Sequence, residues 1–177
     1  INGTLRSECP SSKTYCVHWT NSAPGLNQRD DRASASDVTA TKKVLDKTIK
    51  KYVGAGLRKP LGDGGNGSRA GNPNGRVDIY LMDLRSFGLY GYCANDGALP
   101  SGTYVAPVYC VLDNDFANYP VGAGKARKVT VAHEYFHAVQ GRTTGSRTPG
   151  SWRAWRPGPR TRSSTRSTTT CRTSGAA

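Results

Sequence analysis

Hydrophobic and polar residues follow β-strand patterns in three segments of the chain. Residues 13–20 (KTYCVHWT) alternate β-forming residues, and residues 76–83 (RVDIYLMD) place Val77, Ile79 and Leu81 on one face. Residues 104–112 (YVAPVYCVL) form the third segment, in which Pro107 predicts an edge strand or a bulge. We therefore expect three strands.

Two further segments have apolar residues at helical spacing. The first is expected to begin after an N-cap at Ser36 or Asp37 and to end at Gly54 and Gly56, with lysines on its polar face. Its apolar positions are Val38, Val44, Leu45, Ile49, Tyr52 and Val53. The second helix is expected over residues 126–140. The residues expected to face the sheet there are Val129, Ala132, Phe136 and Val139.

The remaining segments read as connections. Residues 60–76 form a Gly/Asn loop whose Asp and Asn content could suit Ca²⁺, but the spacing does not match an EF-hand, which favours a flexible loop. Residues 84–102 are a Gly/Tyr-rich connection, and residues 113–125 are a loop. The order strand, helix, strand, strand, helix predicts an α+β fold with a small mixed sheet and a backing helix.

Charge divides the chain into two parts. Residues 1–140 hold 17 Lys and Arg and all 12 Asp and Glu, whereas residues 141–177 hold eight Arg, no acid and no Val, Ile, Leu, Met, Phe or Tyr. We expect a folded domain over residues 1–140 and an unstructured basic tail over residues 141–177. The tail could be an arm for nucleic acid or a linker, and its composition also fits translation of a GC-rich gene in the wrong frame.

The cysteines indicate the compartment. Cys9 with Cys16 and Cys93 with Cys110 are two local pairs without zinc-ribbon spacing, and Cys171 is left over. Two disulfides in a secreted protein are the favoured interpretation, and scattered reduced thiols are the alternative. No initiating Met or signal region stands at Ile1, which suggests a mature, truncated or excised N-terminus, and no apolar run approaches the roughly 20 residues that span a bilayer.

A metal-binding motif, His133-Glu134-Tyr135-Phe136-His137, lies in the second predicted helix. Residues four apart project from one helical face, so both imidazoles can reach one Zn²⁺. Glu134 lies about 100° around the helix and can act as the general base toward water activated by zinc. His18 is the remaining histidine and is interpreted as a half-buried strand residue. A catalytic zinc site needs a third protein ligand.

Several motifs resemble a family of secreted bacterial zinc metalloproteases found in actinobacteria and myxobacteria. They are YCVHW (15–19), GRVDIYLMDL (75–84), GLYGYC (88–93), YCVLDNDF (109–116) and VTVAHEYFHAVQ (129–140). The resemblance implies a zincin-like fold, zinc on His133 and His137, and Glu134 as base. Gluzincin-type members take their third ligand from a glutamate in a pattern close to Trp-x-Met-Glu-Gly-x-Ala-Thr-Trp.

This chain departs from that pattern, because no Asp, Glu or His follows His137. With suitable synonymous codons, the neighbouring frame of residues 151–158 reads Met-Glu-Gly-Leu-Ala-Thr-Trp, which is the missing segment. We therefore expect a zinc metallopeptidase for peptide or protein substrates that is impaired as translated. The alternatives are an Arg-rich nucleic-acid-binding protein with an incidental motif and a non-catalytic secreted module of the same fold. Neither membrane nor nucleic acid is the favoured partner.

Overall fold

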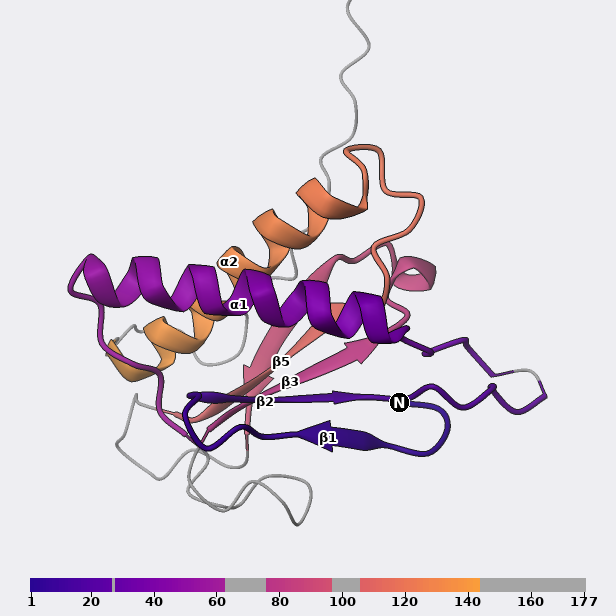
Figure 1. Cartoon of the computed structure of the whole chain (residues 1–177), viewed down its shortest axis with the longest axis horizontal. Helices are drawn as coiled ribbons and strands as arrows, with labels where there is room; N and C mark the ends of the chain where they lie inside the picture. Colours follow the sequence, from indigo (N-terminus) through magenta and orange to yellow (C-terminus); the bar gives the residue numbers. More distant parts are fainter. Residues whose placement is uncertain (27, 63–75, 97–105, 144–177) are drawn as a thin grey trace, which may run out of the picture.

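The computed structural model describes residues 1–26, 28–62, 76–96 and 106–143, and these form an α+β fold with a five-stranded mixed sheet (Figure 1). Both long helices cover one face of the sheet. The elements are β1 (Arg6–Glu8), β2 (Tyr15–Trp19), α1 (Ala35–Gly54), β3 (Val77–Met82), the 3-10 turn η1 (Arg85–Phe87), β4 (Gly91–Asn95), β5 (Val108–Asp113) and α2 (Ala123–Thr143). The predicted fold class is confirmed at this level.

The sheet has the strand order β1-β2-β3-β5-β4. Its three central strands, β2, β3 and β5, are parallel, and the edge strands β1 and β4 are antiparallel to their neighbours. Alternate residues of the central strands point toward the helices, and the predicted face of β3 is confirmed: Val77, Ile79 and Leu81 are each at most 1% exposed. The main core lies between this face and the two helices.

Helix α1 begins two or three residues earlier than its pattern predicts, depending on which of the two expected N-caps is taken. The hydroxyl of Ser34 accepts a hydrogen bond from the backbone N–H of Asp37 at 3.1 Å, so Ser34, not Ser36 or Asp37, is the N-cap. The helix ends at Gly54, as expected. Gly56 follows with a φ of +77°, a left-handed conformation that glycine adopts without steric cost.

Three strand predictions need correction. The connection predicted over residues 84–102 contains η1 and strand β4, and the short edge strand β1 was not predicted at all. Pro107 precedes β5 and does not lie inside it, so β5 takes an interior position between β3 and β4 rather than an edge. Proline has no N–H to donate, but the Pro107 carbonyl still accepts from the N–H of Asp96 at 2.9 Å.

Helix α2 is longer than the predicted 126–140, and its buried face is rotated from the one expected. Val129 is 58% exposed and Phe136 is 37% exposed, so neither packs on the sheet. The residues that do so include Val131, Tyr135 and Ala138. Of the residues expected to face the sheet, Val139 is buried in the core as predicted. The prediction was wrong for Val129 and Phe136 because the helix turns Glu134 inward.

Some predictions fall outside the described residues. These are most of the loop at residues 60–76, and the basic tail from residue 144 onward, so the proposed division at residue 140 stays a prediction. Within the described ranges, neither helix is long and apolar enough to cross a membrane.

Candidate metal centre on helix α2

The two motif histidines converge on the outer side of α2. Their Nε2 atoms are 3.0 Å apart and their ring centroids are 4.6 Å apart, with His133 exposed and His137 half-buried. Two nitrogens bound tetrahedrally to one zinc ion would lie about 3.3 Å apart, given Zn–N bonds of roughly 2.0–2.1 Å. The pair therefore fits two positions of a zinc site.

Gln140 orients the second of these imidazoles. Its Oε1 lies 3.0 Å from His137 Nδ1, so a proton on Nδ1 donates to the amide oxygen and Nε2 becomes the ring nitrogen with the lone pair that a metal would bind. Burial lowers the pKa of His137 and so does the neighbouring His133, while the bond to Gln140 acts in the opposite direction. The neutral imidazole that binds metals is thereby favoured.

Glu134, which lies between the two histidines in the sequence, turns its side chain toward the protein interior. Its side chain is buried, its Oε1 has no hydrogen-bond partner among the described residues, and burial raises the pKa of its carboxyl to about 7. A buried carboxyl group without a partner is unfavourable for folding, which makes it a candidate for a functional group.

Strand β4 allows α2 to approach closely at this point. A Cβ atom at Gly91 would lie 2.8 Å from Glu134 Cγ and 2.8 Å from Thr130 Cγ2. Only glycine therefore leaves room for the helix. No pattern in the sequence pointed to Gly91, because it lies in the segment that was predicted to be a connection. Gln140, by contrast, stands three residues after His137, a spacing that places both on one helical face.

Three further contacts fix α2 on the sheet and on α1. The Tyr52 hydroxyl donates to the carbonyl of Ala132 at 2.9 Å, and the hydroxyls of Tyr135 and Thr14 are 3.1 Å apart. The sulfur atoms of Cys93 and Cys110 lie 3.1 and 3.6 Å from the carbonyl oxygen of Glu134. The motif backbone is thus held from both sides.

Both predicted disulfides are present. Cys9 pairs with Cys16 at an S–S distance of 2.12 Å, and Cys93 pairs with Cys110 at 1.97 Å. The second pair joins residues directly opposite each other on β4 and β5. Cys171 lies outside the described residues.

One other group in the described part of the chain has the composition of a metal site: Cys9, Cys16 and His18. Its sulfurs are joined in a disulfide and are not thiolates, the form that binds metals. His18 is 3% exposed, more buried than expected, and its nitrogens lie 2.7 Å from Ser7 Oγ and 2.9 Å from Asp78 Oδ1. His18 is therefore a structural residue. No third ligand joins His133 and His137 within the described residues.

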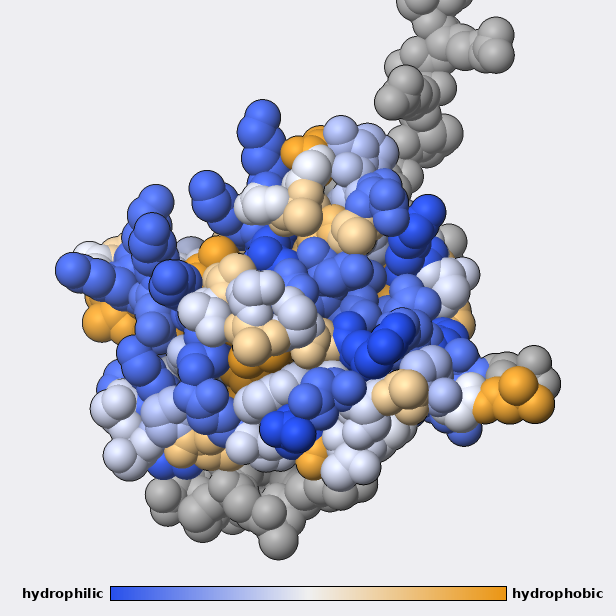
Figure 2. Space-filling view, turned by 45° about the vertical axis from the view of Figure 1, so that its right-hand side comes forward, coloured by the Kyte–Doolittle hydropathy of each residue, from blue (hydrophilic) through white to orange (hydrophobic). Residues whose placement is uncertain are grey.

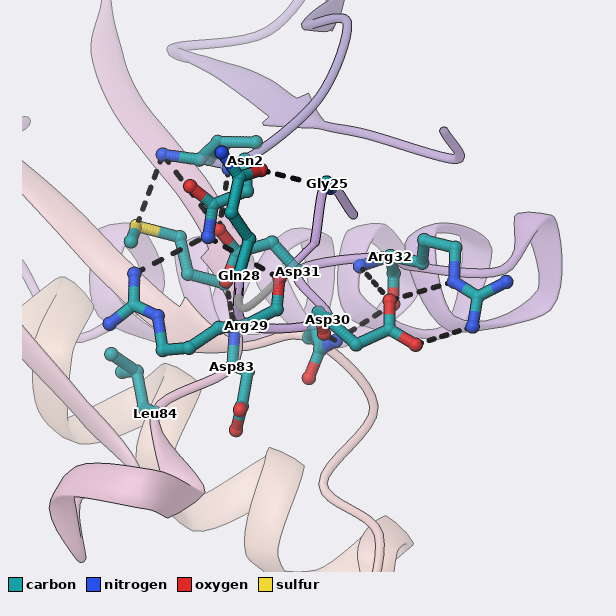
Figure 3. A network of polar contacts seen from close by, with 12 residues as sticks. Asn2, Gly25, Gln28, Arg29, Asp30, Asp31, Arg32, Asp83 and Leu84 are labelled. Atoms are coloured by element: carbon teal, nitrogen blue, oxygen red, sulfur yellow. Dashed lines mark hydrogen bonds and ion pairs between the residues drawn. The ribbon is translucent and has the colours of Figure 1, made fainter. Parts of the chain in front are cut away.

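A second polar cluster, around Asp31, was not foreseen (Figure 3). The Asp31 carboxylate is buried and accepts from the N–H of Asn2 at 2.6 Å and from that of Asp83 at 3.0 Å. It thus ties the first residues of the chain to the segment after β3. Because both oxygens are already occupied, this cluster serves the fold.

Comparison with known proteins returns no match: no family model, no curated protein and no solved structure matches the chain. The geometry of α2 and its neighbours therefore carries the functional argument.

Proposed function

We propose that this chain is a secreted zinc metallopeptidase of zincin-like fold, in which His133 and His137 bind zinc and Glu134 is the general base. The observation that carries the proposal is the convergence of the two Nε2 atoms, 3.0 Å apart, on a helix whose intervening Glu134 is buried with its Oε1 lacking a hydrogen-bond partner among the described residues. The two disulfides support the extracellular location.

The fold supports the same proposal. The motif helix packs on β4 and β5, so the edge strand β4 lies against Glu134. Among the described residues β4 is the edge strand of the sheet, so an extended peptide substrate could pair with its outer side. Substrate binding along β4 would bring a scissile bond toward the histidine pair.

Zinc held by His133 and His137 would supply a Lewis acid that polarises the scissile carbonyl and acidifies water. Glu134 would take the proton from the attacking water and pass it to the leaving amine. A carboxyl whose pKa is raised to about 7 by burial exchanges protons readily near neutral pH. Gln140 would keep the His137 ring in its ligating orientation.

The missing third ligand limits the activity that we expect. A catalytic zinc site uses three protein ligands, and the 40 residues after His137 contain no Asp, Glu or His. We therefore expect weakened zinc affinity and little or no hydrolysis by the chain as it stands.

Zinc binding is the first test. Equilibrium dialysis of the full chain should show zinc bound by the wild type and by Glu134→Gln, and little bound by His133→Ala or His137→Ala. Lys125→Gln is the matched control, because Lys125 is an exposed residue of the same helix, and this variant should bind as much zinc as the wild type. Absence of any zinc on the wild type would refute the metal proposal.

Casein hydrolysis is the second test. Any residual activity should disappear on adding a chelator and in Glu134→Gln. Robust wild-type cleavage that a chelator abolishes would overturn the expectation of impairment while keeping the mechanism. Cleavage that survives both treatments would refute the mechanism.

A further inference from the structure

A basic groove runs between α1 and α2, on a flank of α2 different from that of the histidine pair. It encloses about 380 Å³, and its lysines come from both helices: Lys43, Lys47 and Lys51 from α1, and Lys128 from α2. None of the residues that line it is acidic. Hydrophilic side chains project over the helical side of the molecule in the space-filling view (Figure 2).

No acidic group within the described residues pairs with the groove lysines, whereas two neighbouring lysines are paired. Lys42, next in sequence to Lys43, is bonded to Glu8, and Lys13 is bonded to Asp46 at 2.9 Å. The three groove lysines of α1 stand four residues apart, a spacing at which like charges repel along a helix. This spacing of like charges is mildly unfavourable for the helix.

The floor of the groove is apolar. Val44 and Ala132 line it beside the polar Thr48. The Tyr52 hydroxyl donates its single proton to the Ala132 carbonyl, so it cannot donate to a ligand. The Tyr52 ring packs edge-on against Phe136, with centroids 5.8 Å apart. The groove therefore has ammonium groups at its rim, and its one aromatic lining residue, Tyr52, is already packed against Phe136 and provides no row of rings on which successive nucleic-acid bases could stack.

We propose that this groove binds an extended acidic segment of a polypeptide. Lysines four residues apart on a helix are separated by about 6 Å along its axis. Alternate side chains of an extended peptide repeat at about 6.6–6.8 Å, so carboxylates on one side could meet successive lysines. The intervening apolar side chains would cover the floor. This site is separate from the proposed zinc site, because Ala132 and His133 point about 100° apart on the helix.

Lysine footprinting tests the proposal. It can be done on the full chain, because residues 141–177 contain eight Arg but no lysine and therefore add no signal. The probe is a synthetic peptide of alternating glutamate and alanine, about eight residues long. At ten times its Kd, the peptide should slow acetylation of Lys43, Lys47, Lys51 and Lys128 by about tenfold, measured by mass spectrometry. Exposed lysines outside the groove, Lys50 and Lys125, should react at unchanged rates.

A charge-matched pair of variants completes the test. Replacing Lys43, Lys47 and Lys51 by Gln should weaken peptide binding by about tenfold at low salt. Replacing the exposed Arg6, Arg58 and Lys125 by Gln removes the same charge elsewhere and should leave the affinity near that of the wild type. Equal loss in both variants, or uniform protection of all lysines, would overturn the proposal. An oligonucleotide of equal charge that protects the groove lysines more strongly than the peptide would also overturn it.

Discussion

Gly91 on β4 and Glu134 on α2 are in direct contact, and the missing side chain of Gly91 is what allows it. A Cβ atom at Gly91 would lie 2.8 Å from Glu134 Cγ and 3.1 Å from the Val111 carbonyl oxygen. Because the Val111 oxygen belongs to the backbone, rotation of side chains alone cannot relieve its conflict with the added Cβ atom. Strand β4 would have to shift relative to β5, and the Glu134 and Thr130 side chains of α2 would have to move as well.

Gly91→Ala should therefore destabilise the fold by about 1–3 kcal/mol through overpacking. Urea unfolding measures this free energy. Gly54→Ala is the matched control, since nothing lies within 4 Å of a Cβ atom at the last residue of α1. That variant should be neutral or more stable, by up to about 1 kcal/mol. Equal stability of Gly91→Ala and the wild type would contradict the close packing.

Asp113 is expected to make stability depend on pH. Its buried carboxylate accepts from the N–H groups of Phe116 at 2.7 Å and Leu84 at 3.1 Å. Burial raises the pKa of Asp113, although these bonds and the nearby Tyr119 hydroxyl oppose the shift. Between its ordinary and its raised pKa, the folded state binds more protons than the unfolded state. The free energy of unfolding should therefore fall as pH rises through this window.

Asp113→Asn should remove that slope and also cost stability. The new amide can keep one acceptor, for Phe116, but leaves the buried N–H of Leu84 without one, at a cost of about 1–3 kcal/mol. The difference in unfolding free energy between the wild type and the variant should be larger at the acidic end of the window than at neutral pH. Denaturant unfolding at a series of pH values gives both quantities. A constant difference would show that Asp113 does not titrate as inferred.

The two disulfides should contribute unequally. Cys93 and Cys110 are 17 residues apart and Cys9 and Cys16 only 7 apart, so the first closes the longer loop. On the chain-entropy account, replacing Cys93 and Cys110 together by Ala should cost about 3 kcal/mol, and the other pair about 1 kcal/mol less. Thermal and urea unfolding of the two double variants, compared with the wild type, measure the difference. The reverse order would argue that local packing outweighs loop closure.

The sequence was a good guide where periodicity is strong. The structure confirms the helix that the spacing of apolar residues predicted for α1, and it confirms the buried face formed by Val77, Ile79 and Leu81. Both patterns arise because one side of the element is buried, and the spacing of apolar residues along the chain reflects this burial directly. Strand β4 carries no such pattern: its Gly91 is selected by the approach of α2, and tertiary contacts of that kind leave no periodic trace.

The candidate site shows the same division. The spacing of His133 and His137 was enough to predict their convergence, because one helical turn sets it. The inward position of Glu134 was not foreseen, since apolar residues such as Val129 and Phe136 were expected to take the buried face. A polar residue in the interior breaks the rule on which such predictions depend, and functional sites are where that rule most often fails.

Gln140 gives the sharpest prediction about the metal site. Its Oε1 is 3.0 Å from His137 Nδ1, and a partner on the second ring nitrogen fixes the ring orientation of a metal-binding histidine. Gln140→Ala should lower zinc affinity by about tenfold or more. Helix stability should change little, because alanine favours helices and Gln140 is only half-buried. Competition with a chromogenic chelator measures the affinity, and circular dichroism checks the fold. Gln140→Glu provides the discriminating comparison, since its carboxylate can accept the same hydrogen bond and should restore most of the affinity. If Gln140→Ala binds zinc as tightly as the wild type, the bond to His137 has no role in metal binding.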